Sequence, residues 1–200
     1  MELVFQQKRL KIQSPVTLEK VAEKISELLE DNYYFSHFVA DGIEVNEIND
    51  SFLKLHIQTI KRLEVIAKTS NEFINDIILE TENYTIRALP ELGLIAEEFY
   101  NNPNAETWIR FDQLLEGLQW LNGMIEVVRQ NKERPYNWNK YEDVVAVLNV
   151  ESVNLAEAVG NKDYVLIGDI IQYEILHCFE TLKSITQTTI DNEGKRPNLN

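Results

Sequence analysis

The sequence predicts an α+β protein in which a small sheet-containing part precedes an antiparallel four-helix bundle. Short apolar and β-branched runs, separated by turn residues, occupy the chain up to residue 68. From residue 69 onward, the apolar residues recur with the period of a helix over four long segments. The acidic residues concentrate in that second part, so composition changes where periodicity does.

The first 69 residues divide into short elements. LVF at 3–5 and LKI at 10–12 flank the polar QQKR and predict a hairpin. Residues 14–32 predict an amphipathic helix, because Val21, Ile25 and Leu28 share one face. The aromatic run that follows is interrupted by Asp41-Gly42, a strong hairpin signal. SFLKLHIQTI (51–60) predicts one or two helical turns, and RLEVIAKT (62–69) predicts a last strand.

This order of elements resembles the ubiquitin-like β-grasp fold over residues 1–68. The segment ADGIEV (40–45) resembles the hairpin that such domains often carry after their helix. Family members that act as sulfur carriers or protein tags end in a free Gly-Gly, whereas the equivalent point here, AKTSNEF (67–73), lies inside the chain. The resemblance therefore implies a fold and does not imply carrier chemistry.

Four helices are predicted in the second part. They cover residues 72–100, with Thr69 or Ser70 as the cap and Pro90 as a kink or break, and residues 107–130, 142–159 and 163–190. Short connections between long helices favour an antiparallel arrangement. The tail, residues 191–200, lacks apolar periodicity and is expected to be frayed. The predicted domains are thus 1–68, a β-grasp-like domain, 69–190, an acidic four-helix bundle, and the tail.

One five-residue pattern occurs twice, as EGLQW (116–120) and as DIIQY (169–173). Similar helix ends precede both copies, and their spacing differs by two helical turns. A duplicated helical hairpin explains this, and so does chance similarity between amphipathic helices. A helical wheel predicts one core stripe on each of these two helices: Phe111, Leu114, Leu115, Leu118, Leu121 and Ile125 on the first, and Ile167, Ile171, Ile175, Cys178, Leu182 and Ile185 on the second. Each copy of the pattern turns an acidic and an aromatic side chain away from its stripe. These residues are Glu116, Trp120 and Met124 on one helix and Asp169 and Tyr173 on the other.

Such a second face has two explanations. The β-grasp part can pack across one of the two helices while the other merely exposes a tyrosine. Alternatively, the face binds a partner or a second copy of the chain, because Trp and Tyr commonly anchor interfaces. A secondary candidate is the connection KERPYNWNKY (132–141) with Tyr136, Trp138 and Tyr141. Its aromatic residues either fix a turn to the bundle or contact a ligand.

Catalytic and metal-binding patterns are sparse. Glu174 and His177 form one ExxH pair, as in di-iron bundles, but such a site needs a second pair and further carboxylates. A hydrogen-bonded pair at the edge of the core is therefore expected. Cys178 falls on the predicted core stripe, which favours an inert thiol. The sequence predicts no catalytic residue, no metal and no cofactor, and hence a non-enzymatic protein.

Charge and cysteine content limit the compartment and the partners. Residues 70–200 carry 22 Asp and Glu against 10 Lys and Arg, and they account for most of the chain's net charge of −14. Such a surface repels phosphate backbones, so nucleic acid is excluded as a partner. The single cysteine, together with the lack of a leader and of a long apolar run, favours the cytoplasm and argues against a membrane.

The favoured function is a cytoplasmic protein-interaction module or adaptor, which acts on a protein partner or by self-association. An alternative is an export chaperone, because small acidic helical bundles resemble flagellar and secretion chaperones that hold an apolar helical segment of a client. A metal-binding helical-bundle enzyme is a distant third. The combination of the two parts resembles uncharacterised proteins of Gram-positive bacteria.

Overall fold

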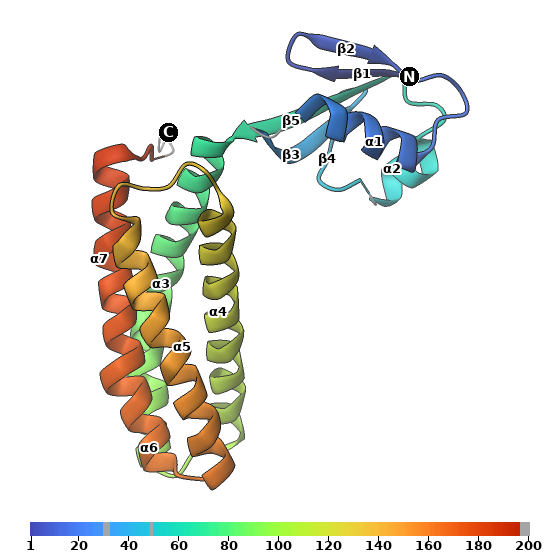
Figure 1. Cartoon of the computed structure of the whole chain (residues 1–200). Coiled ribbons are helices and arrows are strands. Elements are labelled where there is room, and N and C mark those ends of the chain that lie inside the picture. Colours follow the sequence, from blue (N-terminus) through green and yellow to red (C-terminus); the bar gives the residue numbers. More distant parts are fainter. Residues whose placement is uncertain (30–32, 49, 197–200) are drawn as a thin grey trace. The chain divides into compact units, whose positions relative to one another are not determined.

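The computed structural model describes residues 1–29, 33–48 and 50–196 and has an α+β fold (Figure 1). The chain divides into two compact units, Met1–Phe73 and Ile74–Asn200. The first unit contains a mixed five-stranded sheet, and the second unit is helical.

The sheet consists of β1 (Glu2–Phe5), β2 (Lys8–Lys11), β3 (Tyr33–Ala40), β4 (Ile43–Val45) and β5 (Arg62–Thr69). Their order across the sheet is β2-β1-β5-β3-β4. Strands β1 and β5 are parallel, and the other neighbouring pairs are antiparallel. Both predicted hairpins and the predicted last strand are confirmed.

The turn between β3 and β4 explains why Asp41-Gly42 is a hairpin signal. Both residues have positive φ, 48° for Asp41 and 92° for Gly42, which suits the right-handed twist of the flanking strands. The Asp41 carboxylate also accepts hydrogen bonds from the backbone N–H groups of Lys61 and Arg62, at 3.0 and 2.8 Å. Because these contacts stabilise the charged form, they lower the pKa of Asp41.

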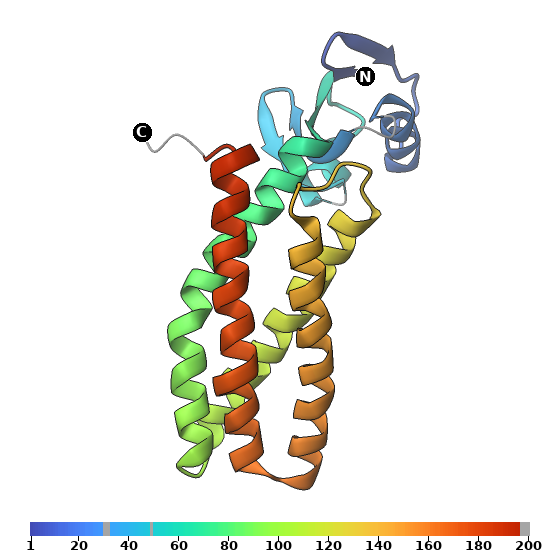
Figure 2. The same cartoon turned by 60° about the vertical axis from the view of Figure 1, so that its left-hand side comes forward.

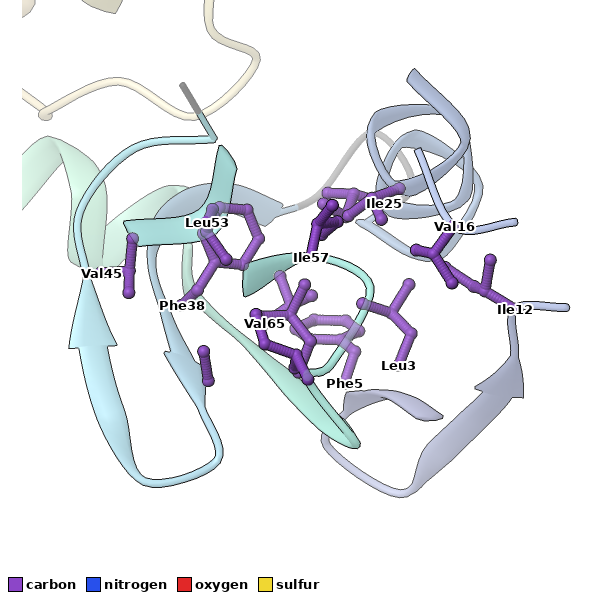
Figure 3. Packing of buried hydrophobic residues seen from close by; sticks show 14 of the residues in the cluster. Leu3, Phe5, Ile12, Val16, Ile25, Phe38, Val45, Leu53, Ile57 and Val65 are labelled. Carbon is purple, nitrogen blue, oxygen red and sulfur yellow. The ribbon is translucent and has the colours of Figure 1, made fainter. Parts of the chain in front are cut away.

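Two helices complete the first unit, α1 (Leu18–Leu29) and α2 (Ser51–His56). Asp50 begins α2 by accepting a hydrogen bond from the N–H of Phe52. Ile25 of α1 and Leu53 of α2 lie in one apolar cluster with Leu3 and Val65 of the sheet (Figure 3). Leu3, Leu53 and Leu63 are fully buried in this cluster. The predicted end of this first helix, residues 30–32, lies outside the described residues.

The sheet unit ends slightly after its last strand. Strand β5 stops at Thr69 and α3 begins at Ser70, next to the predicted boundary of 68. However, Phe73 stacks on Tyr34 of β3, with ring centroids 4.1 Å apart. The first turn of α3 therefore belongs to the compact sheet unit.

The helical unit begins with α3 (Ser70–Tyr100), α4 (Ala105–Gln130) and α5 (Trp138–Asn161). A last, continuous helix follows, which consists of α6 (Tyr164–Asp169), η2 (Ile170–Ile175) and α7 (Leu176–Glu193). These helices run side by side in both views (Figures 1 and 2). Helix α3 continues through Pro90 without a break. Helix α5 begins at Trp138, inside the segment that was predicted to be a connection, because Tyr141 and Val144 already follow the buried face.

The predicted frayed tail requires a correction. Residues 191–193 complete α7, and the backbone of Lys195 exchanges hydrogen bonds with the Asn75 side chain. Polar contacts order this segment, which is why apolar periodicity did not reveal it. The remaining residues of the predicted tail, 197–200, lie outside the described residues.

The core stripes predicted for two of the helices are confirmed. On α4, Phe111, Leu114, Leu118, Leu121 and Ile125 are buried, and Leu115 is half-buried. On α6–η2–α7, the buried residues include Ile167, Ile171, Ile175, Cys178, Leu182 and Ile185. The described part of the chain contains no helix that is both long and apolar enough to cross a membrane.

A six-residue π-helical segment, η2, interrupts the regular winding at the second copy of the repeated pattern. Its wider turn is visible in the hydrogen bond from the N–H of Leu176 to the carbonyl of Ile171, five residues earlier. Such segments are rare and frequently occur at functional sites. The segment contains Tyr173 and follows Asp169, so it forms part of the predicted contact face.

Candidate functional site

The two halves of the predicted contact face lie in different surroundings. Trp120 is half-buried, and its ring lies 5.3 Å from that of Tyr84 on α3. Tyr84 in turn contacts Phe179 of α7 and covers Gly117. Trp120 therefore packs inside the helical unit. Met124, one turn further on, is half-buried, whereas Glu116 is exposed.

Asp169 and Tyr173 belong to the second copy of the repeated pattern. They lie near the start of the long C-terminal helix, where α6 continues into η2. The Tyr100 hydroxyl donates a 2.7 Å hydrogen bond to the Asp169 carboxylate. Desolvation and this hydrogen bond raise the pKa of Tyr100 to about 12. Tyr173 is 66% exposed. These two residues line a groove with α5, which Glu116, Trp120 and Met124 do not line.

That groove runs between α5 and the continuous helix α6–η2–α7. Its wider hollow has a volume of about 500 Å³ and is lined by Glu151, Asn154, Glu157, Asn161, Leu166, Asp169, Ile170, Tyr173 and Glu174. A second hollow of about 490 Å³ is lined by Lys140, Asp143, Val144, Glu180, Thr181, Ser184 and Ile185 of the same two helices. Together these residues define the α5/α7 groove.

Helical geometry joins the two hollows into one surface. At 100° per residue, the α5 residues of both hollows fall within one arc of the helix, and Val147 and Val150 fall in the same arc. Val147 and Val150 are 41% and 58% exposed. The arc extends from Lys140 to Asn161, a length of about 30 Å at 1.5 Å per residue. The α5 side of the groove is therefore long enough to accommodate a helix of several turns.

The charge of the α5/α7 groove is strongly negative. Of the described residues that line its two hollows, six are acidic and one, Lys140, is basic. The acidic residues stand beside exposed apolar ones, notably Leu166 at 42% exposed and Val150. Val147 and Val150 thus form an apolar strip on α5, and the carboxylates form an acidic rim beside it. This arrangement has the chemistry to bind a helix that is apolar on one side and basic around it.

The secondary candidate loop has a structural role at two of its three residues. Trp138 and Tyr141 are 7% and 1% exposed, and their rings are stacked 5.6 Å apart. The Tyr141 hydroxyl lies 2.7 Å from Thr189 Oγ1 of α7, and burial raises the Tyr141 pKa. Tyr136 alone is exposed, at 58%, and its hydroxyl accepts a hydrogen bond from Asn192.

The ExxH residues do not form the expected pair at the edge of the core. Both side chains are exposed; Glu174 lines the α5/α7 groove, whereas Nδ1 of His177 lies 4.0 Å from Glu180. Within the described residues, no three His, Cys, Asp or Glu side chains gather in a metal-binding arrangement. Cys178 is buried, and its burial raises the thiol pKa to about 11, with Glu174 and Glu151 adding to the effect.

Sequence reasoning identified one wall of the groove and missed the other. Asp169 and Tyr173 were predicted from the repeated pattern, and the residues of α5 were not. A signal was nevertheless present, because Val147, Val150 and Val153 recur every three residues on α5, outside its buried positions. Only the packing of the unit shows that no described helix covers these valines.

Comparison with known proteins places the groove in a defined sequence family. A family model described as "Domain of unknown function (DUF8042)" matches residues 76–185, more than half of the chain. The match lies within the helical unit and includes all the residues that line the α5/α7 groove. No match was found among the curated proteins or among the solved structures.

Proposed function

Because the chain belongs to the DUF8042 family, a domain family of unknown function, we propose its role from the structure: it is a protein-interaction module that binds a basic amphipathic helix in the α5/α7 groove. The observation that carries the proposal is the apolar strip of α5 beside a π-helical wall, with an acidic rim. Helix-in-groove binding needs these features, an apolar floor for anchors spaced along one helix face and complementary charge around it.

The site chemistry favours binding over catalysis. Two groups of the helical unit with a raised pKa, Tyr141 and Cys178, are buried core residues. A third, Tyr100, has its pKa raised to about 12 beside Asp169, so its hydroxyl stays protonated and serves as a hydrogen-bond donor. The carboxylates of the groove line an open surface, where they can steer a basic partner and set its register. The module is therefore non-enzymatic, and its partner is a protein.

The architecture that we propose with this function is a β-grasp-like domain followed by an antiparallel four-helix bundle. The strand order, with β1 parallel to β5 and a helix after the first hairpin, supports the first part. The long helices with short connections support the second. A cytoplasmic location is proposed as well, because a single, buried cysteine suits a reducing compartment.

A photo-crosslinking experiment tests the proposal. A benzophenone amino acid placed at Val150, on the same arc of α5 as the groove residues, is compared with the same group at Ile109, which is similarly exposed on α4. After irradiation in extract of the native cell, mass spectrometry identifies the partner segment joined to each position. We expect position 150 to capture one segment that is predicted to be helical, basic and apolar on one face.

Charge reversal provides a matched control. The variant Glu157→Lys/Glu174→Lys changes the groove, whereas Glu91→Lys/Glu116→Lys makes the same charge change at exposed sites that do not line it. Capture at position 150 should fall about tenfold in the groove variant alone. Equal losses in both variants, an acidic captured segment, or equal capture from position 109 would contradict the proposal.

An export chaperone is the second candidate, and the helix-sized length of the α5/α7 groove favours it. A chaperone of this kind holds a terminus that is unfolded on its own, whereas an adaptor binds a folded partner. Limited proteolysis of the isolated partner distinguishes them. Rapid cleavage within the captured segment indicates a chaperone client, and resistance indicates a folded partner of an adaptor.

A further inference from the structure

A buried carboxylate lies in α3, away from the residues of the α5/α7 groove. Glu82 is 3% exposed, and its neighbours along the helix, Thr81 and Thr85, are also buried. Fully buried glutamates are rare unless an opposite charge pairs with them, because desolvation disfavours the charged form. The partner of Glu82 is Arg196, which is 114 residues further along the chain.

The contact between the two side chains is bidentate. Two guanidinium nitrogens of Arg196 donate to the two oxygens of Glu82, at 2.6 and 2.9 Å. This planar geometry is specific to a guanidinium and is unavailable to a lysine ammonium. A second carboxylate, Asp191, lies 3.8 Å from the same guanidinium and is itself largely exposed.

The segment that carries Arg196 is held by two further contacts. The N–H of Lys195 donates to the Asn75 side-chain oxygen at 2.8 Å, and the Asn75 amide donates back to the Lys195 carbonyl at 3.0 Å. The N–H of Gly194 donates to the carbonyl of Ile190 at the end of α7. These bonds place Arg196 two helical turns along α3 from Asn75, where Glu82 lies.

The two partners differ in how freely each can leave. The Glu82 side chain is 4% exposed and fixed within a long helix, whereas the Arg196 side chain is 50% exposed, on a short segment after α7. We propose that Glu82 is a guanidinium-binding site, which the chain's own Arg196 fills and which a guanidinium compound from solution occupies when this segment lifts away. The site lies outside the α5/α7 groove and is independent of the function proposed for it.

Removal of the guanidinium leaves the carboxylate buried and unpaired. We expect Arg196→Ala to lower the Tm of the helical unit by about 5 °C. Arg87→Ala is the control, because it removes the same charge from an exposed position of α3. The double variant Glu82→Gln/Arg196→Ala should regain most of the lost Tm, since the amide introduced in place of the carboxylate carries no charge that needs a partner.

Chemical rescue tests the specificity of the site. N-methylguanidinium chloride at about 20 mM should raise the Tm of Arg196→Ala and leave that of Glu82→Gln/Arg196→Ala unchanged, because only the first keeps an empty carboxylate site. Sodium chloride at equal ionic strength controls for screening. An unchanged Tm in Arg196→Ala, or equal responses to the two salts, would overturn the proposal.

The wild-type chain gives an independent readout that needs no destabilised variant. The amides of Gly194 and Lys195 should exchange slowly with deuterium, and their exchange should accelerate as N-methylguanidinium displaces Arg196. The amides at the centre of α4 should not respond. Exchange of Lys195 at the rate of an unstructured chain would also exclude the site as described.

Discussion

Tyr84 occupies the space that a glycine leaves on the neighbouring helix. A Cβ added at Gly117 would lie 1.6 Å from the Tyr84 hydroxyl oxygen and 2.6 Å from the adjacent ring carbon. The ring can therefore pack between Trp120 and Phe179 only while residue 117 has no side chain. This close approach explains why a glycine stands in the middle of a long helix. Glycine otherwise destabilises a helix there, because it loses more backbone conformational freedom on folding than other residues.

Gly117→Ala should destabilise the helical unit by about 1–3 kcal/mol, because Tyr84 must leave its place in the core. Gly123→Ala on the same helix is the matched control, since the new Cβ would meet nothing within 4 Å beyond its chain neighbours and the adjacent backbone of its own helix. That change should stabilise by about 0.5–1 kcal/mol through helix propensity. Urea unfolding measures both changes. Equal effects of the two substitutions would show that the packing of the Tyr84 ring does not depend on the absence of a side chain at residue 117.

The buried thiol of Cys178 gives a prediction for alkaline pH. Its pKa is about 11 in the folded chain and near 9.0 when the thiol is solvated. The unfolded state therefore loses this proton first as the pH rises, and folding stability falls between these two values. Wild type should lose more stability between pH 8 and pH 10 than Cys178→Ala, in which the tyrosines still titrate. Parallel pH profiles from urea unfolding would contradict this.

At the level of elements, caps determine where helices begin. Asn104 starts α4 with a capping box, in which its side chain accepts from the N–H groups of Glu106 and Thr107 while the Thr107 hydroxyl accepts from the Asn104 N–H. Asp163 starts α6 in a similar way, by accepting from the N–H of Leu166. Both signals are local and so can be read from the sequence.

Asn104→Ala should lower the free energy of unfolding by about 1 kcal/mol, because two N–H groups at the start of α4 lose their acceptor. Asn104→Asp keeps the acceptor and adds a favourable interaction with the helix dipole, so its stability should stay near that of wild type. Thermal unfolding followed by circular dichroism compares the two. A loss in Asn104→Asp as large as that in Asn104→Ala would refute the capping role.

The π-helical segment shows the limit of reasoning about elements. Its sequence, IIQYEI, has the apolar pattern of an ordinary helix. A regular 100° wheel nonetheless identified the buried residues on both sides of it, such as Ile167 and Leu182. The wheel did not identify the wider turn itself, because a pattern that fits an ordinary helix carries no signal for a π-helical turn.

For the whole molecule, the two compact units have separate apolar cores. The core of the sheet unit draws on all five strands and on α1 and α2, with Leu63 at 0% exposed. The helical unit has its own buried residues, from Ile74 to Ile190. Each unit therefore has buried apolar residues of its own, as expected of a domain.

Leu63→Ala should destabilise the sheet unit by about 2–5 kcal/mol through a cavity in that core. Hydrogen exchange measured by mass spectrometry should show faster exchange in β1, β3 and β5 and unchanged exchange in α4 and α7. Ile66→Ala on β5 is the control, because its side chain is partly exposed and leaves a smaller cavity. Equal acceleration in both units would mean that they unfold together.

The sequence by itself determined the α+β class, both hairpins of the sheet, and the core stripes of α4 and α6–η2–α7. These features depend on local signals: Asp41-Gly42 needs only its own backbone freedom, and the spacing of Phe111, Leu114 and Leu118 needs only helical geometry. Tertiary structure alone decided that Trp120 packs on Tyr84 while Tyr173 remains exposed, although both end the same repeated pattern. It also decided that Arg196 reaches Glu82 and that no described helix covers Val147, Val150 and Val153 of α5. A side chain's exposure depends on which neighbours pack against it, and distant parts of the chain supply those neighbours.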